Sequence, residues 1–443
     1  MFVGIDWGSE SHEICAVDQG GSKLLTHSVA HDGEAIAGLV DRVLALVDGK
    51  PEGLAVAMEA PHGTMVEAFL ERGAAVFSIN PKQVDRFRDR YSVAGAKDDR
   101  LDAYVIANSL RTDRNLYRRL SLDDAAIVEL RTLVRAREDF QQDILRLGNR
   151  LREQLHRYYP QILELGDVYS DPWLWEVFEM TSTPEQARHL QRAKVDAILV
   201  RHRIRRVDAT DVVRILRKKP VPAAPGVVEA ARQHAQLLIP SLRLALQQRR
   251  DCDRRLQSLL DHLSSSETPS ENTSGQQTHR DAEILLSLVG VGIVNGATML
   301  AEAGRLLRDR DYQGLRVLSG TAPVRRQTGK QGKNGRSAPV SMRRACNTRL
   351  REAVHHWANV AAQRDPRTKQ HYARLRAAGH SHGRALRGVA DRLLAMLVAM
   401  LKNGKLYDPG RPRRLKKPVA KRWRVHAPRG GQSATDGAGV VGH

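Results

Sequence analysis

Short apolar runs alternate with helical patterns over the first 80 residues. The runs FVGI, EICAVD, LLTHSVA, LAVAM and AVFSI have the length and composition of strands. Between them, Ile36–Leu46 and Met65–Arg72 place apolar residues three and four positions apart, as amphipathic helices do. This alternation predicts an α/β domain over residues 1–120.

Beyond residue 120 the hydrophobic spacing becomes that of long helices. One apolar seam consists of Leu133, Phe140, Ile144, Leu147, Leu151 and Tyr158, and a second consists of Leu238, Leu242, Ala245, Cys252, Leu256, Leu259 and Leu263. Arg137 and Gln154 interrupt the first seam, and Arg249 interrupts the second. The spacing predicts coiled-coil helices within 121–165 and 227–263, which could pair as an antiparallel hairpin or between subunits.

An inserted segment, 166–226, separates the two long helices. It contains Trp173, Trp175, a helix start at Thr183-Pro184-Glu185 and the basic run Arg201–Arg206. These features predict a basic helical segment. A nucleic-acid-binding module and a solvated basic helix face explain the basic run equally well.

Polar composition marks two further boundaries. Residues 264–281 are rich in Ser, Thr and Gln, which is typical of a flexible linker. We expect a mainly helical C-terminal domain over 282–409. Residues 410–443 are basic and then glycine-rich, which predicts a disordered tail that contacts nucleic-acid phosphates without sequence preference.

Charge narrows the class of partner. The chain of 443 residues holds 71 Lys and Arg against 50 Asp and Glu, a net charge of +21, so a polyanion such as nucleic acid is the simplest partner. The three cysteines, Cys15, Cys252 and Cys346, show no CxxC spacing, which argues against a disulfide framework or a zinc ribbon. Without a leader-like or membrane-spanning apolar stretch, we expect a cytoplasmic protein.

Acidic residues stand at the ends of two predicted strands and at the start of a helix. Asp6 and Glu59 each follow an apolar run, where a charge is costly unless a cation neutralises it. Asp99 and Asp102 are one helical turn apart and therefore share a face. Asp98 has the position of a helix N-cap.

Four carboxylates meeting at one site would repel one another without a divalent cation. Two Mg²⁺ ions about 4 Å apart, or Mn²⁺ in their place, would remove that repulsion and would assist phosphodiester cleavage. The ordered set therefore predicts a metal-dependent nuclease site. The opening GID is also typical of actin-like sugar kinases, but no second phosphate loop or adenosine-type glycine motif follows, and the basic C-terminal half has no role in such an enzyme.

The blocks GIDWG, AMEAPHG, SINPKQV and AKDDRLDAYVIA resemble the N-terminal domain of the DEDD transposases of the insertion-sequence-110 family, which are bridge-RNA-guided recombinases. The resemblance implies an RNase H/RuvC-like fold. It implies that the catalytic and metal-binding carboxylates are Asp6, Glu59, Asp99 and Asp102. It also implies that Asp98 is no ligand, because the family pattern reads Lys-x-Asp-x-x-Asp-Ala, with Lys97 as the lysine that contacts nucleic acid.

The segment Leu285–Glu302 contains Leu-Val-Gly-Val-Gly between two helical halves. It resembles a helix-hairpin-helix element, whose glycine turn allows backbone N–H groups to approach DNA phosphates; a tight turn in a core is the alternative. Basic residues gather after it and are expected to contact nucleic acid: Arg325, Arg326, Lys330, Lys333, Arg336, Arg343 and Arg344.

The family resemblance extends from about Leu285 to Pro409. The family's nucleophile is a serine before a glycine in the basic loop, and here Thr328 stands before Gly329. We therefore predict Thr328 as the hydroxyl nucleophile, followed by Ser337 and then Ser341. Threonine is β-branched and more crowded than serine, so all three hydroxyls could instead bind phosphate.

These observations predict an insertion-sequence transposase that cuts and rejoins donor and target DNA. The resemblance implies guidance by a structured noncoding bridge RNA and a bacterial, nucleoid-associated protein. Strand exchange needs several active sites, so we expect a homodimer or homotetramer. One alternative is a RuvC-like junction nuclease that acts through the carboxylates alone, without a covalent intermediate. Another is a nucleic-acid-binding protein without catalytic activity.

Overall fold

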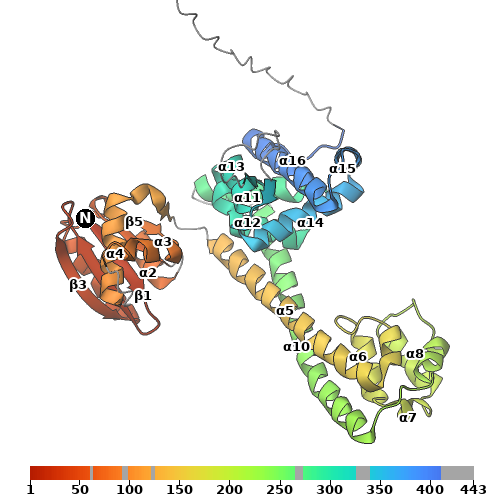
Figure 1. Ribbon diagram of the computed structural model, residues 1–443. Coiled ribbons are helices and arrows are strands. Elements are labelled where there is room, and N and C mark those ends of the chain that lie inside the picture. Colours follow the sequence, from red (N-terminus) through yellow and green to blue (C-terminus); the bar gives the residue numbers. More distant parts are fainter. Residues whose placement is uncertain (60–62, 92–97, 121–124, 265–272, 326–339, 411–443) are drawn as a thin grey trace, which may run out of the picture.

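The computed structural model describes residues 1–59, 63–91, 98–120, 125–264, 273–325 and 340–410. Figure 1 shows an N-terminal α/β domain, a helical domain formed by the C-terminal part of the chain, and a long helical hairpin that carries a group of short helices at its far end. Within these ranges, no helix combines the length and apolar character needed to cross a membrane.

The α/β domain is built on a six-stranded sheet of order β3-β2-β1-β4-β5-β6. Its strands are β1 (Phe2–Trp7), β2 (Ser11–Val17), β3 (Lys23–Ala30), β4 (Ala55–Met58), β5 (Ala75–Ser78) and β6 (Arg118–Arg119). Strands β1, β4 and β5 are parallel to one another, whereas β2, β3 and β6 join by antiparallel pairing. Each apolar run predicted to be a strand forms one of β1 to β5, which confirms the mixed α/β prediction.

Helices cover both faces of this sheet. They are α1 (Gly33–Ala45), α2 (Thr64–Glu71), α3 (Pro81–Arg88) and α4 (Asp99–Thr112), with short 3₁₀ turns at Pro51–Gly53 and Arg114–Leu116. Because side chains alternate along a strand, Val3 and Ile5 pack with α1 and α2. Ala57 and Phe77 pack on the other face with α3 and α4.

Gly4 allows α4 to lie directly on β1. A Cβ atom at this position would lie 2.1 Å from the carbonyl oxygen of Ala103 and 2.4 Å from the backbone nitrogen of Ala107. Any larger residue would push the helix away from the strand. The glycine before Ile5-Asp6 therefore fixes how closely the first turn of α4 approaches the end of β1.

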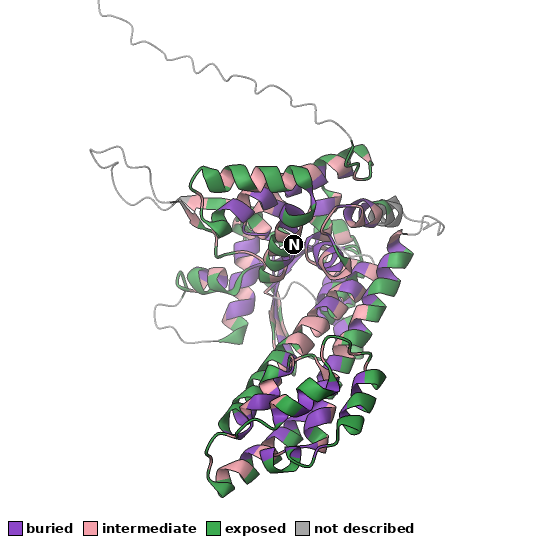
Figure 2. Ribbon diagram, turned by 90° about the vertical axis from the view of Figure 1, so that its right-hand side faces the viewer, coloured by how far each residue is buried: buried purple, intermediate pink, exposed green. Residues whose placement is uncertain are grey.

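The long hairpin consists of α5 (Ala125–Tyr158) and α10 (Pro225–Ser264). The helices run antiparallel within one chain, since Glu129 pairs with Arg255 and Arg137 with Asp253, and Gln141 bonds to Arg249. Figure 2 shows buried positions recurring along both helices. Of the two pairings left open by the sequence, the chain itself forms the hairpin.

Short helices fill the segment between α5 and α10. They are α6 (Pro172–Met180), α7 (Pro184–Ala187), α8 (Arg192–Arg201) and α9 (Ala209–Leu216), after a 3₁₀ turn at Pro160–Glu164. Trp173 and Trp175 are buried in their core. The predicted helix start is confirmed, because Thr183 caps α7. In the basic run, Arg201 pairs with Glu176 and Arg206 with Asp171, so part of its charge is neutralised inside the segment.

The C-terminal domain is mainly helical. It contains α11 (Thr273–Leu286), α12 (Ile293–Arg308), α13 (Tyr312–Leu318), α14 (Thr348–Arg364), α15 (Pro366–Ala377) and α16 (His382–Asn403), with a two-stranded sheet of β7 (Pro323–Arg325) and β8 (Val340–Met342). Its core surrounds the buried Trp357 and also takes in the first turns of α5 and the last turns of α10.

The stretch 264–281, predicted as a linker, is helical in its second part. Helix α11 begins at Thr273 and runs through Ala282, Ile284 and Leu285, which are buried in the domain core. Asp281 is also buried and pairs with Arg310. Packing of these residues in the domain core extends the helix back into the polar sequence. The composition of the stretch alone does not predict this packing.

Candidate functional site

The alternation of side chains along the strands directs two acidic residues toward α4. Asp6 follows Ile5 and therefore lies on the same face of the sheet as Gly4, which contacts α4. Glu59 follows Met58 and lies on the same face as Ala57, which packs with α4. In the parallel pairing of β1 with β4, Ile5 is opposite Met58. Asp6, near the end of β1, and Glu59, directly after β4, thus lie at the same end of two neighbouring strands.

The first turn of α4 supplies two more carboxylates. Asp98 is the N-cap, and its side chain accepts a hydrogen bond of 3.1 Å from the backbone N–H of Arg100. Asp99 and Asp102 lie in the first turn, where the positive end of the helix dipole favours negative charge. Asp99 is exposed, whereas Asp102 is only 2% exposed. Asp98 therefore has the capping role that the sequence analysis allowed for it.

Three of the four predicted carboxylates converge. Asp6, Asp99 and Asp102 each offer a carboxylate oxygen, and these oxygens lie within 4.8 Å of one another. We refer to these three residues as the carboxylate cluster. Glu59 is not one of its members, although it follows β4 on the same face of the sheet.

Arg88, the last residue of α3, binds the buried member of the cluster. Its Nε donates to Asp102 Oδ1 at 2.5 Å, and its Nη2 donates to Asp102 Oδ2 at 2.7 Å. The hydrogen bond to Asp102 raises the pKa of the Arg88 guanidinium, and the charges of Asp102, Asp85 and Glu59 act in the same direction. Arg88 therefore carries a fixed positive charge against the carboxylate cluster.

The donor set fits a hard divalent cation. Mg²⁺ and Mn²⁺ prefer carboxylate oxygens, and Mg²⁺ sites in proteins commonly use one or two carboxylates together with water and substrate oxygens. The carboxylate cluster brings three acidic side chains together, and one guanidinium is bound to Asp102. The arrangement can therefore take up further positive charge.

Two residues beside the carboxylate cluster were missed by the sequence analysis. One is Arg88. The other is Glu13, which is paired with Asp6 across the antiparallel strands β1 and β2 and lies 3.7 Å from Arg100. Finding Glu13 requires the register of β1 with β2, which the sequence does not give. Arg88 could have been singled out, since it is four residues after the buried Val84 and so lies on the packed face of α3.

Most of the predicted basic loop lies outside the described residues, as do the first two predicted hydroxyls. The residues of the loop concerned are Arg326, Thr328, Lys330, Lys333, Arg336 and Ser337, and Lys97 of the N-terminal domain also lies outside the described residues. Strands β7 and β8 flank the loop in sequence, with Arg325 opposite Val340 and Ser341 opposite Val324. After β8, Arg343 is partly buried and Arg344 is exposed.

The predicted helix-hairpin-helix segment forms the end of α11, a turn, and α12. Gly290 has a φ of +91°, and a Cβ there would lie 3.0 Å from the backbone nitrogen of Ala361 in α14. The indole of Trp357 donates to the carbonyl oxygen of Val289 at 3.1 Å. Gly290 thus serves packing in the domain core. Gly292, the N-cap of α12, has open space where a Cβ would stand.

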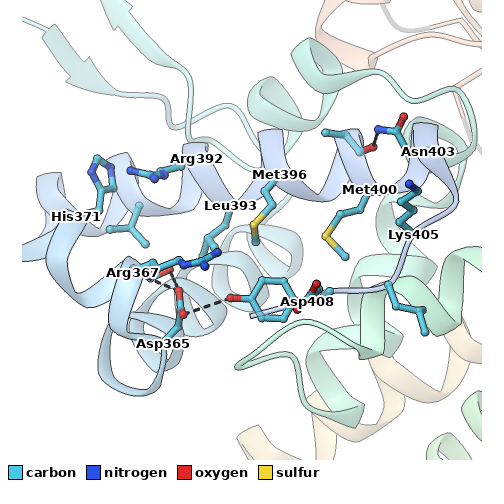
Figure 3. A pocket seen from close by; sticks show the side chains of 15 residues that line it. Asp365, Arg367, His371, Arg392, Leu393, Met396, Met400, Asn403, Lys405 and Asp408 are labelled. Atoms are coloured by element: carbon cyan, nitrogen blue, oxygen red, sulfur yellow. Dashed lines mark hydrogen bonds between the residues drawn. The ribbon is translucent and has the colours of Figure 1, made fainter. Parts of the chain in front are cut away.

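A pocket of about 370 Å³ lies elsewhere in the C-terminal domain. Figure 3 shows Met396 and Met400 pointing into it from α16, with Asp365 at the opposite wall. Asp365 accepts hydrogen bonds from Thr368 and Tyr407. The residues that line the pocket include none that the sequence analysis selected, so we assign it no part in the reaction.

Comparison with known proteins shows to which class of protein this chain belongs. Residues 3–160 match the sequence profile of a family described as "Transposase", and residues 282–373 match the profile described as "Transposase IS116/IS110/IS902 family". The chain is 30% identical over 419 residues to the mini-circle putative transposase for IS117 of Streptomyces coelicolor, covering 93% of this chain and 96% of that protein. The fold, the carboxylate cluster and these matches identify a transposase.

Two further relatives agree with this class. The putative transposase y4uE of Sinorhizobium fredii is 41% identical over 238 residues, which is 53% of this chain and 64% of that protein. The uncharacterized 42 kDa protein of insertion element IS900 from Mycobacterium paratuberculosis is 26% identical over 411 residues, covering 92% and 97% of the two chains. The chain belongs to the IS116/IS110/IS902 transposase family, as its sequence motifs indicated.

Proposed function

We propose that this transposase cuts and rejoins DNA with a divalent metal site formed by Asp6, Glu59, Asp99 and Asp102. The observation that carries the proposal is the convergence of three of these carboxylates at the end of β1 and the start of α4. The strand order supports an RNase H/RuvC-like assignment for residues 1–120, because β1, β2 and β3 follow one another by antiparallel pairing and the parallel strands β4 and β5 lie on the other side of β1.

Each carboxylate would have a role in holding the cations. Asp6, Asp99 and Asp102 would bind through their converging oxygens, and Glu59 would complete the set from the end of β4. When bound, Mg²⁺ or Mn²⁺ would lower the pKa of water or of a hydroxyl group and would stabilise charge on the phosphate. Asp99 and Asp102 would bind from the first turn of α4.

The C-terminal domain, residues 282–409, would supply the hydroxyl that attacks DNA. The oxygen of Thr328 would bond to phosphorus while the bond from phosphorus to one deoxyribose oxygen breaks. The proton lost by threonine would end on that leaving oxygen, and Ser337 and then Ser341 are the alternatives. Arg325, Arg326, Lys330, Lys333, Arg336, Arg343 and Arg344, together with Lys97, would neutralise phosphate charge.

The remaining assignments follow from the family resemblance and the charge. We propose that a structured noncoding bridge RNA guides the reaction on donor and target DNA, that the hairpin of α5 and α10 belongs to a coiled-coil assembly surface, and that the active species is a homodimer or homotetramer. The inserted segment 166–226 and the tail 410–443 would add nonspecific contacts to nucleic acid, which suits the net charge of +21.

Trapping on a nicked suicide DNA substrate tests this function. Wild-type protein with Mg²⁺ should form a covalent protein–DNA adduct, which Thr328→Ala should abolish and Thr328→Ser should retain. Asp6→Asn should abolish both the adduct and strand cleavage. Metal-dependent cleavage without any adduct, in wild type and in the variants of all three hydroxyls, would replace the proposal with a RuvC-like junction nuclease. Cleavage unaffected by Asp6→Asn would exclude the metal site.

A further inference from the structure

Arg88 engages both oxygens of Asp102, a residue that also belongs to the carboxylate cluster. The side chain of Asp102 is 3% exposed and that of Arg88 is 19% exposed. An ionised carboxylate buried to this extent is strongly disfavoured unless a cation is bound to it. In the protein without metal, the guanidinium of Arg88 provides that charge, so the cluster can fold before any metal arrives.

We propose that Arg88 is a built-in counter-ion of the carboxylate cluster, with which a divalent cation must compete. The inference rests on the proposed function, because it takes Asp6, Asp99 and Asp102 to be the residues that hold the cation. Two effects lower the affinity for metal. The guanidinium repels a second cation nearby, and it engages the oxygen atoms that Asp102 would otherwise offer.

Asp85 gives Arg88 a second partner outside the carboxylate cluster. It precedes Arg88 by one turn of α3, and its Oδ1 lies 3.3 Å from Nη1 of Arg88. The side chain of Asp85 is 65% exposed, so this carboxylate needs no cation for its own stability. Arg88 can therefore release an oxygen of Asp102 to the metal and keep an ion pair with Asp85.

A similar ion pair elsewhere in the chain provides the control. Arg310 donates to both oxygens of Asp281 at 2.5 and 2.8 Å, and the two side chains are 16% and 5% exposed. Asp281 is not in the carboxylate cluster. Removing Arg310 should disturb folding to a comparable degree without changing a metal site in the α/β domain.

Titration of the full-length protein with Mn²⁺, followed by electron paramagnetic resonance of the free ion, measures the competition. Arg88→Met should bind Mn²⁺ at least about tenfold more tightly than wild type, because a repelling unit charge is removed. Arg88→Lys keeps the charge but loses the two-point hold on Asp102, so its affinity should lie between them. Asp85→Asn should bind Mn²⁺ more weakly than wild type, and Arg310→Met should match wild type.

A second measurement separates competition from damage to the fold. In EDTA, thermal unfolding of Arg88→Met should begin at a lower temperature than that of wild type. Mn²⁺ should raise the unfolding temperature of Arg88→Met by more than it raises that of wild type. If Arg88→Met does not fold, Arg88→Lys carries the same test: tighter Mn²⁺ binding than wild type supports the proposal.

Wild-type or weaker affinity in a folded Arg88 variant would overturn the inference, because Arg88 would then only orient Asp102. Asp102→Asn separates this failure from failure of the proposed function. If wild type binds Mn²⁺ and Asp102→Asn does not, the metal site stands and only the role of Arg88 is wrong. If both bind equally, the metal site itself is wrong.

Discussion

Two buried arginine–aspartate pairs, one in the α/β domain and one in the C-terminal domain, have similar geometry and different neighbours. In each, the arginine donates to both carboxylate oxygens over 2.5 to 2.8 Å. Asp102 has the carboxylates of Asp6 and Asp99 beside it. Asp281 has cations beside it, because the charges of both Arg310 and Arg308 act on its carboxyl group.

The charges next to each pair distinguish an ion pair that only stabilises the fold from one that belongs to a candidate metal site. Breaking either pair would leave a buried charge without its partner. At Asp281 the neighbouring arginines already supply more positive than negative charge. At Asp102 the excess is negative, and it lies where a phosphate-cleaving enzyme would hold divalent cations. The neighbours, rather than the pair itself, therefore distinguish the candidate metal site.

The largest expected effect is on DNA cleavage, which should depend on Asp102 and not on Asp281. Asp102→Asn should lower metal-dependent DNA cleavage by about 10³-fold or more, because a ligand that holds charge-stabilising metal is lost. Asp281→Asn should leave cleavage by the folded protein within about threefold of wild type. Single-turnover cleavage, corrected for the folded fraction by circular dichroism, measures both. Equal losses in the two variants would contradict the distinction.

Mn²⁺ should restore the stability that is lost when Arg88 is replaced, but not the stability that is lost when Arg310 is replaced. Arg310→Met should lower the free energy of unfolding of the C-terminal domain by about 3–5 kcal/mol, the usual cost of removing one partner of a buried pair. Urea unfolding with and without Mn²⁺ should give the same loss. Arg88→Met should be destabilised in EDTA and recover in excess Mn²⁺, which at about 100 times its Kd contributes about 2.7 kcal/mol. Recovery of Arg310→Met by Mn²⁺ would contradict the comparison.

A smaller effect concerns pH. Burial raises the pKa of the Asp281 carboxyl group above its ordinary value, although Arg310 acts in the opposite direction. The folded protein then binds this proton more tightly than the unfolded chain does. Its free energy of unfolding should fall as the pH rises from the ordinary carboxyl pKa of about 4 through the raised value. Relative to Asp281→Asn, wild type should lose stability across that window. A gain instead would mean that attraction to Arg310 outweighs burial.

Much of the α/β domain could be predicted from the sequence, because β1 to β5 each have an apolar run and α1, α2 and the start of α4 each have a helical pattern, whereas β6 and α3 were not predicted. The same local rules found Asp6 at a strand end and placed Asp99 and Asp102 on one helix face. They could not show that Gly4 brings α4 onto β1, since that contact joins residues about 100 positions apart. The convergence of the carboxylates depends on this contact.

Other features escaped the sequence for the same reason. The spacing from Val84 places Arg88 on the packed face of α3, but only the fold shows that its partner is Asp102. The polar sequence before Asp281 looks like a linker until Arg310 and the domain core are in place. Pairing of the two long helices was left open because their seams would suit either a hairpin or a dimer. Long-range contacts decide each of these features.

Anomalous scattering from crystals soaked in Mn²⁺ tests the metal site most directly. We expect a peak within bonding distance, about 2.0–2.3 Å, of oxygens from Asp6, Asp99 and Asp102, and no peak at Asp281. The account would be contradicted by crystals of a cleavage-competent protein in which these three carboxylates hold no Mn²⁺, or in which the ion binds at a different set of side chains.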